Sequence, residues 1–564
     1  MNASSQGMSK AYVAIAVLVL VIAFTVFCCL SIQAMVKLIP EQLQKAAITP
    51  EPPQTLVIGY SPEKEEMFRA LVDGFNSQVA SSNQDVLRID TVRYEPDLMI
   101  EAALQGKLHA ISPDSSIWLD ALDREWKAQS GRESPLVGQS ERYAVSPIVI
   151  AMWEDTARSM GYPDKPLGWV DLLTRAQADP QFKWSHASTG SASGLLATLA
   201  QFYAGAGKTR GLNEADVKAQ TTLDYVAAVE KTVRYYGEGE WSVLQRVIAE
   251  GRGYLDAFVC QEQLVIYYNT HARTGDRLIA IYPVEGTLWE DHPLALLEIE
   301  GLTARQRATF SHFVEYIKSP ERQREILSRG YRPVDLSIAL DTPPSPLTAA
   351  NGVDPTQPKT ALQMPAPGVI EVVRDVWWYT KRHTNLYLVV DVSGSMQENS
   401  KLANAQAALR VFMEQIKGDA ERVGLITFSS TAAETVPLDE LKNNRQQINA
   451  AIDQLKAGGN TALLDAVDLA YARLQKLGDT ERINAIVVMT DGQENSSRMT
   501  LGRLIAQVMD ENKSGVPVVI FCIGYGSDAD VKVLTALAEA SGGKYYAGDL
   551  ETIRRLYKIL STYF

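Results

Sequence analysis

The chain has 564 residues, 46% of them hydrophobic, which is enough for several domains that each bury a core of their own. Its formal net charge of −13 argues against nucleic acid as a partner, because phosphate binding requires concentrated Lys and Arg. The 4 cysteines form neither a disulfide framework nor a Cys-x-x-Cys metal site.

Residues 11–32 form an uncharged apolar run that predicts a membrane anchor. As a helix this run would span about 33 Å, which is enough to cross the hydrocarbon core. It is longer than the apolar part of a signal peptide, and its end at Val26-Phe27-Cys28 lacks a small-residue cleavage site. Lysines flank it on both sides, so the positive-inside rule barely decides its orientation. We expect residues 1–54 to form a cytoplasmic tip, one N-terminal transmembrane helix and a short stalk.

Residues 55–340 are predicted to form an α/β unit. The apolar run Thr55-Leu56-Val57-Ile58-Gly59-Tyr60 is typical of a strand, and it leads through Ser61-Pro62 into a helical pattern. Further strand-like runs follow, and a small-residue loop at 188–194 precedes an apolar helix. This order of elements resembles bacterial extracellular solute-binding proteins of the type 2 periplasmic fold, and residues 313–333 resemble the last helix and tail of that family. The resemblance implies two α/β lobes that close on a ligand.

Polar residues in this unit stand ahead of expected helices. Hydroxyls and free N–H groups at helix N-termini can bind an anion or a small polar solute. The competing interpretation is that each residue simply caps its helix. The candidate ligand-binding residues are Ser61, Ser115, Ser116, Ser146, Ser188 and Thr189.

Apparent enzyme motifs in the chain are incomplete. Gly207-Lys208-Thr209 resembles the end of a phosphate-binding loop, but the first glycine of that pattern would fall on Phe202. Ser61-Pro62-Glu63-Lys64 has the Ser-x-x-Lys spacing of β-lactamases without their Lys-Thr-Gly partner. No His-Glu-x-x-His or Gly-x-Ser-x-Gly is present. We therefore expect a protein that is not an enzyme.

Residues 341–367 carry seven prolines among small and polar residues, which predicts a fairly stiff extended linker. The aromatic run Val376-Trp377-Trp378-Tyr379 then predicts a leading helix of the last domain, residues 368–564.

That domain begins with the apolar strand Asn385-Leu386-Tyr387-Leu388-Val389-Val390, followed by Asp391-x-Ser393-x-Ser395. Strand-like and helical patterns alternate from there on, which predicts a doubly wound, mostly parallel α/β sheet. Such sheets bind ligands at the carboxyl ends of their strands, so one carboxylate and two hydroxyls are expected at the functional edge. Oxygen donors of this kind suit Mg²⁺, Mn²⁺ or Ca²⁺ and do not suit zinc or copper.

The Asp-x-Ser-x-Ser turn resembles the metal-ion-dependent adhesion site of von Willebrand factor type A (VWA) domains, whose fold is Rossmann-like. The resemblance implies two further ligands, Thr461 after Gly458-Gly459-Asn460 and Asp491 after a second apolar strand. It also implies that a partner protein offers a carboxylate to the metal.

We expect a single-pass cell-membrane protein whose large C-terminal part is extracytoplasmic. Two alternatives remain open. The solute-binding part could serve an ABC-type transporter with the VWA domain as an assembly module, or the VWA domain could be an accessory subunit of an enzyme complex.

Overall fold

The computed structural model describes residues 55–81, 86–272, 275–341, 343–416, 418–525 and 529–548. The transmembrane helix expected at residues 11–32 lies outside these ranges. Among the helices inside them, none combines the length and the apolar character that a membrane crossing requires.

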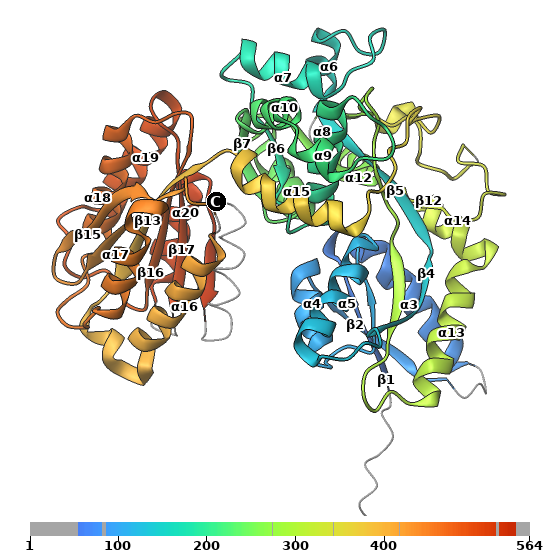
Figure 1. Ribbon diagram of the computed structural model, residues 1–564, viewed down its shortest axis with the longest axis horizontal. Helices are drawn as coiled ribbons and strands as arrows, with labels where there is room; N and C mark the ends of the chain where they lie inside the picture. The colour runs from blue at the N-terminus through green and yellow to red at the C-terminus, as the bar shows by residue number, and fades with distance from the viewer. Residues whose placement is uncertain are drawn as a thin grey trace, which may run out of the picture. The chain divides into compact units, whose positions relative to one another are not determined.

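The first lobe is a five-stranded mixed sheet with the strand order β2-β1-β3-β11-β4 (Figure 1). Apolar residues of β1, such as Leu56 and Ile58, pack against Phe68 and Phe313 of the covering helices. The elements are β1 (Thr55–Tyr60), the 3₁₀ turn η1 (Pro62–Lys64), α3 (Glu65–Ala80), β2 (Arg88–Arg93), α4 (Pro96–Leu104), β3 (Ala110–Ser112), α5 (Ile117–Ser130), β4 (Val137–Arg142), β11 (Pro293–Leu297), α13 (Ala304–Lys318) and α14 (Pro320–Ser328).

The second lobe is built on the strand order β10-β5-β8-β6-β7, with β9 and β12 also paired to β5. Its helix α8 is almost wholly buried, as its run of small and apolar residues predicts. The elements are β5 (Ala144–Trp153), α6 (Glu154–Ser159), α7 (Trp169–Ala178), β6 (Trp184–Ala187), α8 (Ala192–Ala206), α9 (Glu214–Lys218), α10 (Gln220–Glu230), β7 (Val233–Gly237), α11 (Glu240–Glu250), η2 (Gly251–Gly253), β8 (Ala257–Gln261), α12 (Glu262–His271), β9 (Leu278–Ile281), β10 (Trp289–Glu290) and β12 (Arg332–Pro333).

The proline-rich segment was expected to be a fairly stiff extended linker, and the structure adds that it packs on the second lobe. Leu347 and Val353 are buried in the core of the second lobe, and the short η3 turn (Ala349–Asn351) lies between them. Leu362 N donates to Thr287 O at 2.9 Å, and Thr287 N donates to Thr360 O at 3.1 Å. These apolar anchors and backbone hydrogen bonds hold the described part of the segment on the lobe, a contact that proline content alone does not reveal.

Helix α15 (Pro367–Thr380) also packs differently from the expected leading helix of the last domain. It contacts α8, α9 and α10 of the second lobe (Figure 1). Val369, Ile370, Val373 and Trp377 form its buried stripe and share one core cluster with residues of α8 and α10. The helix predicted from the sequence exists, but its apolar face covers the preceding lobe.

The last part of the chain is a six-stranded sheet with the order β15-β14-β13-β16-β17-β18. All neighbouring strands are parallel except β14 and β15. One face packs on α16 and α17, and the other packs on α18, α19 and α20. The elements are β13 (Thr384–Asp391), η4 (Gly394–Ser400), α16 (Lys401–Gln415), β14 (Arg422–Phe428), β15 (Ala432–Glu440), α17 (Leu441–Asp453), α18 (Leu463–Leu477), β16 (Ile483–Thr490), α19 (Leu501–Ser514), β17 (Val518–Tyr525), α20 (Val531–Ser541) and β18 (Tyr545–Gly548).

This arrangement confirms the predicted doubly wound, mostly parallel sheet. The antiparallel edge strand β15 was not expected, because its partly exposed residues lack the apolar run of a buried strand.

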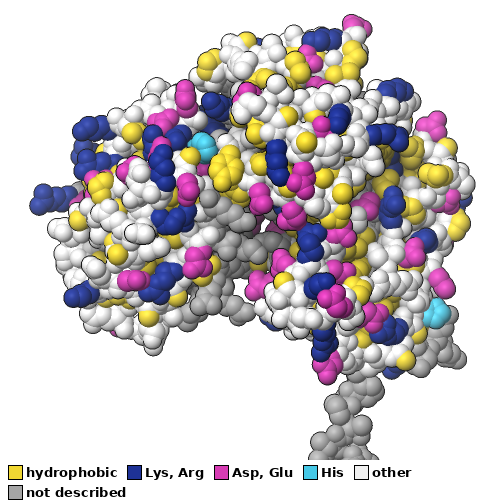
Figure 2. Space-filling view, in the orientation of Figure 1, with side chains coloured by type: hydrophobic (Ala, Val, Ile, Leu, Met, Phe, Trp, Pro, Cys, Tyr) yellow, Lys and Arg dark blue, Asp and Glu magenta, His cyan; other side chains and the backbone are white. Residues whose placement is uncertain are grey.

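Charged side chains of both signs are interspersed on the face drawn in Figure 2. The acidic excess of the chain is therefore not gathered into one patch on that face.

Candidate functional site

The candidate metal site lies where β13 and β16 end side by side. The two strands are parallel, with Val390 opposite Met489, so Asp391 and Asp491 leave the sheet at the same edge. The loop before α18 is fixed to the first turn by two backbone hydrogen bonds. Gly394 N donates to Gly459 O at 3.0 Å, and Gly458 N donates to Val392 O at 2.8 Å.

Four of the five predicted residues are linked by hydrogen bonds. Ser395 Oγ donates to Asp491 Oδ1 at 2.7 Å, and it lies 3.1 Å from Ser393 Oγ. The backbone N of Ser393 donates to Asp391 Oδ1 at 2.7 Å. Both aspartates are fully buried, so their oxygens face this cluster and not bulk water.

Thr461, the fifth predicted residue, lies close to Ser395, with both side chains beside Gly492. A Cβ atom placed on Gly492 would lie 3.4 Å from Thr461 Oγ1 and 3.5 Å from Ser395 Oγ. The Thr461 backbone is held in place by Asn495, whose Oδ1 accepts from Thr461 N at 2.9 Å and whose N donates to Thr461 O at 3.1 Å. All five predicted residues are thus brought together at one edge of the sheet.

Two side chains that contact the candidate site were not predicted from the sequence. Lys401 Nζ donates to Asp491 Oδ2 at 2.6 Å, and Thr490 Oγ1 donates to Asp391 Oδ2. Thr490 directly precedes Asp491 in the sequence, and this position could have identified it as a neighbour of the site. Lys401 is the first residue of α16, and no spacing rule links it to the aspartates.

Burial raises the pKa of Asp391, and the nearby Asp491 raises it further. Hydrogen bonds from Ser393 and Thr490 act in the opposite direction. Two buried carboxylates and three hydroxyls are the oxygen donors that Mg²⁺, Mn²⁺ or Ca²⁺ prefers, so the residues present fit such an ion. Among the described residues, no group of three or more His, Cys, Asp and Glu side chains could hold a metal, which leaves the hydroxyl-rich set as the candidate.

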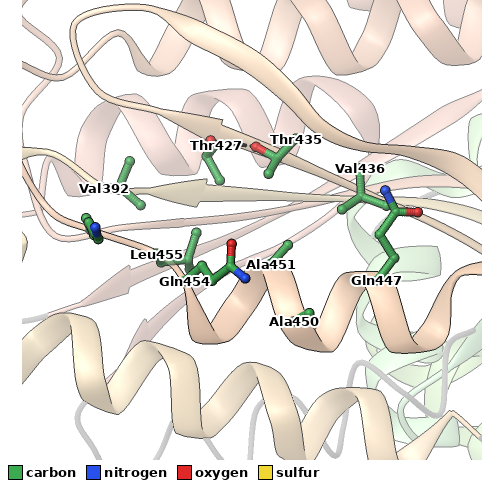
Figure 3. Close-up of a pocket in the computed structure, with 10 residues that line it drawn as sticks. Val392, Thr427, Thr435, Val436, Gln447, Ala450, Ala451, Gln454 and Leu455 are labelled. Atoms are coloured by element: carbon green, nitrogen blue, oxygen red, sulfur yellow. Dashed lines mark hydrogen bonds between the residues drawn. The ribbon is translucent and has the colours of Figure 1, made fainter.

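A hollow of about 500 Å³ lies beside this site, between β14, β15 and α17 (Figure 3). Val392 of the turn after β13 contributes to its wall, and Thr427 and Thr435, on the neighbouring strands β14 and β15 of that wall, share a hydrogen bond of 2.7 Å. Lys456 is the one charged residue in its lining, and none of the five predicted metal ligands belongs to it.

The six predicted solute-site residues have mixed surroundings. Ser61 Oγ donates to Glu63 Oε1 at 2.6 Å, and Ser188 Oγ accepts from Gly190 N at 3.3 Å. The cap of α8 is Ser191, which was not among the candidates. Neither Ser61 nor Ser116 caps its helix with its side chain, contrary to the competing interpretation. The remaining four are placed as follows: Ser115 Oγ accepts from Ile117 N, Ser116 N donates to Asp291, Ser146 is buried in β5, and Thr189 is partly exposed ahead of α8.

Two family models match the chain. Residues 56–332 match the bacterial extracellular solute-binding protein family, and residues 385–558 match the von Willebrand factor type A domain. Solved structures similar to the chain include a von Willebrand factor type A protein from Catenulispora acidiphila, with 21% identity and a TM-score of 0.29 over 32% of this chain and 42% of that one. A periplasmic thiamin binding protein has 12% identity and a TM-score of 0.41 over 59% and 96%.

Curated relatives match over shorter stretches. The uncharacterized protein YfbK of Escherichia coli (strain K12) is 26% identical over 179 residues, 32% of this chain and 30% of that protein. The calcium-activated chloride channel regulator 3A-1 of Mus musculus is 25% identical over 209 residues, 36% of this chain and 21% of that protein. The chain therefore spans less than a third of either relative. Residues 56–332 are thus similar to bacterial extracellular solute-binding proteins, and residues 385–558 are similar to VWA domains.

Proposed function

We propose that the protein is a membrane-anchored extracytoplasmic binding protein with two binding modules. The VWA domain would hold a divalent cation and, through it, a carboxylate of a partner protein. The solute-binding domain would bind a small solute in the cleft between its lobes. The family of that domain is extracellular, and the apolar run at residues 11–32 supplies the expected single-pass anchor.

The observation that carries the proposal is the meeting of Asp391, Ser393, Ser395, Thr461 and Asp491 at one edge of the sheet. These residues would hold Mg²⁺, Mn²⁺ or Ca²⁺. When bound, the ion would supply an exchangeable coordination position for an incoming carboxylate.

The protein's own groups prepare the site for that role. Asn495 fixes the backbone of Thr461, and Thr490 orients the Asp391 carboxylate by donating to its Oδ2. Lys401 balances one of the two buried negative charges, which leaves a net charge of about −1 for the ion to neutralise.

Partner capture from an envelope extract tests the proposal. We expect wild-type protein to retain a partner in Mg²⁺ and to release it in chelator, and the Asp391→Asn variant to retain nothing in either condition. Asp510→Asn is the matched control, because Asp510 is exposed on α19, away from the site. Capture by Asp391→Asn equal to that of the control would refute the metal-bridged mode of binding.

A further inference from the structure

Three crossings of the chain join the two lobes of the solute-binding domain. The first runs from β4 into β5 and can be followed in Figure 1, the second runs from β10 into β11, and the third runs from α14 into β12. Arg142 pairs with Pro293 in the first lobe, whereas Ser146 pairs with Glu290 in the second. His292, between the two pairs, has a φ of 34°, which is a strained conformation for a residue other than glycine. Residues 143–145, 291–292 and 329–331 therefore form the hinge.

Four carboxyl groups are buried around this hinge. Glu63 and Asp114 follow β1 and β3 of the first lobe, while Glu240 begins α11 and Glu290 ends β10 of the second. Their side chains are 4% exposed or less. Burial raises the pKa of Glu290, and Glu240, Asp114 and Glu63 raise it further, which means that the four carboxyls lie within electrostatic reach of one another.

Lys64 is the basic group that faces these carboxyls. Its Nζ donates to Pro113 O at 2.6 Å and lies 4.0 Å from Glu63 Oε1. Arg332 lies nearby but does not offset the charge of these four carboxyls, because it is paired with Glu262 at 2.6 Å. Four carboxyls are thus grouped with one ammonium group, and any of them that ionises would be stabilised by a bound cation and destabilised by a bound anion.

Some polar groups of this cluster have hydrogen-bond partners, and others have none. Glu240 accepts from Gln261 N at 2.8 Å and from Gln261 Nε2 at 2.6 Å. Gln261 Oε1 is therefore free to accept from His292 Nε2 at 2.9 Å, which makes His292 Nδ1 the unprotonated ring nitrogen. Burial lowers the pKa of His292 well below its ordinary value, consistent with a neutral ring.

Four buried atoms at the hinge have no hydrogen-bond partner among the described residues. They are Glu290 Oε1, Glu290 Oε2, His292 Nδ1 and Ser146 Oγ. Ser146 and Glu290 are opposite each other on β5 and β10, so their side chains share one face of the sheet. His292 Nδ1 is an acceptor, and both Glu290 oxygens are acceptors once the carboxyl is ionised, so a donor that reached them would favour the ionised form of Glu290.

We propose that the cleft binds a small organic cation with N–H donors, an ammonium or guanidinium compound, and that Glu290, His292 and Ser146 receive it. This inference rests on the proposed solute-binding role of the domain and specifies its ligand class. It names a cation where the hydroxyl-bearing loops led us to expect an anion or a small polar solute. A metal ion suits the cluster less well, because no three of its acidic or histidine side chains form a metal-holding group among the described residues.

Thermal shift and calorimetry on the full chain test this inference. The probes are putrescine and agmatine, with 1,4-butanediol as the uncharged counterpart of putrescine and sulfate and phosphate as anions. We expect at least one of the two cations to raise the melting temperature of the solute-binding domain by at least about 3 °C, and butanediol and the anions to leave it unchanged. Mg²⁺ is tested on the Asp391→Asn variant, so that the VWA site does not contribute.

Glu290→Gln keeps the shape of the side chain and removes its charge. We expect this variant to melt at or above the wild-type temperature without ligand, because it relieves a buried carboxylate, and to lose the response to the cations. Glu300→Gln, at an exposed position, is the control and should respond as wild type does.

Each other outcome has a distinct meaning. Stabilisation by sulfate or phosphate alone would overturn the cation inference and leave solute binding standing. A response to Mg²⁺ alone that Glu290→Gln abolishes would replace the organic cation with a metal. An unchanged cation response in Glu290→Gln would remove Glu290 from the site. If no probe stabilises the domain, both the inference and the solute-binding half of the proposed function fail.

Discussion

Lys401 determines the charge balance of the VWA site at the scale of single residues. Its ammonium group pairs with Asp491 at 2.6 Å, with side chains that are 8% and 0% exposed. An ammonium group in this position competes electrostatically with a divalent cation for the same carboxylate, and it also stabilises the protein when no cation is bound.

Substitution of Lys401 by Met should therefore have two opposite effects. In chelator the variant should be less stable by up to about 3–5 kcal/mol, because a buried carboxylate loses its partner. Its affinity for Mg²⁺ should rise several-fold, because the competing charge is gone. Thermal unfolding in chelator and in Mg²⁺, together with calorimetric titration, measures both effects.

Lys442→Met is the matched control, because the pair of Lys442 with Glu440 is on the surface and contributes little. A Lys401→Met variant that matched this control in chelator, or that bound Mg²⁺ more weakly than wild type, would contradict the assigned role.

At the scale of elements, α15 belongs to the core of the second lobe. Trp377 is 1% exposed and packs edge-on against Tyr236 of β7, with ring centroids 5.2 Å apart. Tyr379, two residues later, is 70% exposed. The helix therefore stabilises the solute-binding domain through one face.

Trp377→Ala should destabilise that domain by about 3–5 kcal/mol, the usual cost of removing a buried aromatic ring. Hydrogen exchange followed by mass spectrometry should show faster exchange in peptides of α8 and α10. Peptides of β13 and β16 should exchange as in wild type, and Tyr379→Ala should change neither set. Faster exchange confined to β13 and β16 would instead assign α15 to the VWA domain.

At the scale of the whole molecule, the buried acids make stability depend on pH. Burial raises the pKa of Asp114 to about 7, with a further contribution from Glu63, and burial also raises the pKa of Glu240 and Glu290. These folded-state pKa values lie above the unfolded ones. The folded state therefore retains protons that the unfolded state releases between about pH 4 and pH 7, and the free energy of unfolding falls as the pH rises through that window.

We expect the solute-binding domain to melt at a higher temperature at pH 5.5 than at pH 8 in the absence of ligand. Glu290→Gln should reduce this difference, since it removes one of the titrating groups, whereas Glu300→Gln should not. A domain that melts at a higher temperature at pH 8 would show that these carboxyls are ionised at little cost in the folded state.

The sequence was sufficient to predict the strands and the residues that meet at the candidate metal site, for a physical reason. Buried parallel strands read as continuous apolar runs, and the site residues follow directly from the ends of such runs, as Asp391 and Asp491 do. Thr461 was found by resemblance to a known motif.

Other features depend on tertiary packing and leave no local pattern. The apolar stripe of α15 predicts a buried face without indicating what it covers. Four acids that meet only where the two lobes join are far apart in the sequence: Glu63, Asp114, Glu240 and Glu290. The prediction from sequence therefore relied on the hydroxyl-bearing loops, which suggested an anion or a small polar solute.

The central claim is that the VWA domain binds a divalent cation through the predicted residues. Calorimetric titration of Mg²⁺ into the full chain and its Asp391→Asn variant tests it most directly. We predict a binding event in wild type and in Asp510→Asn that is at least about tenfold weaker in Asp391→Asn. Equal Mg²⁺ binding by all three proteins, or none by any of them, would contradict the claim.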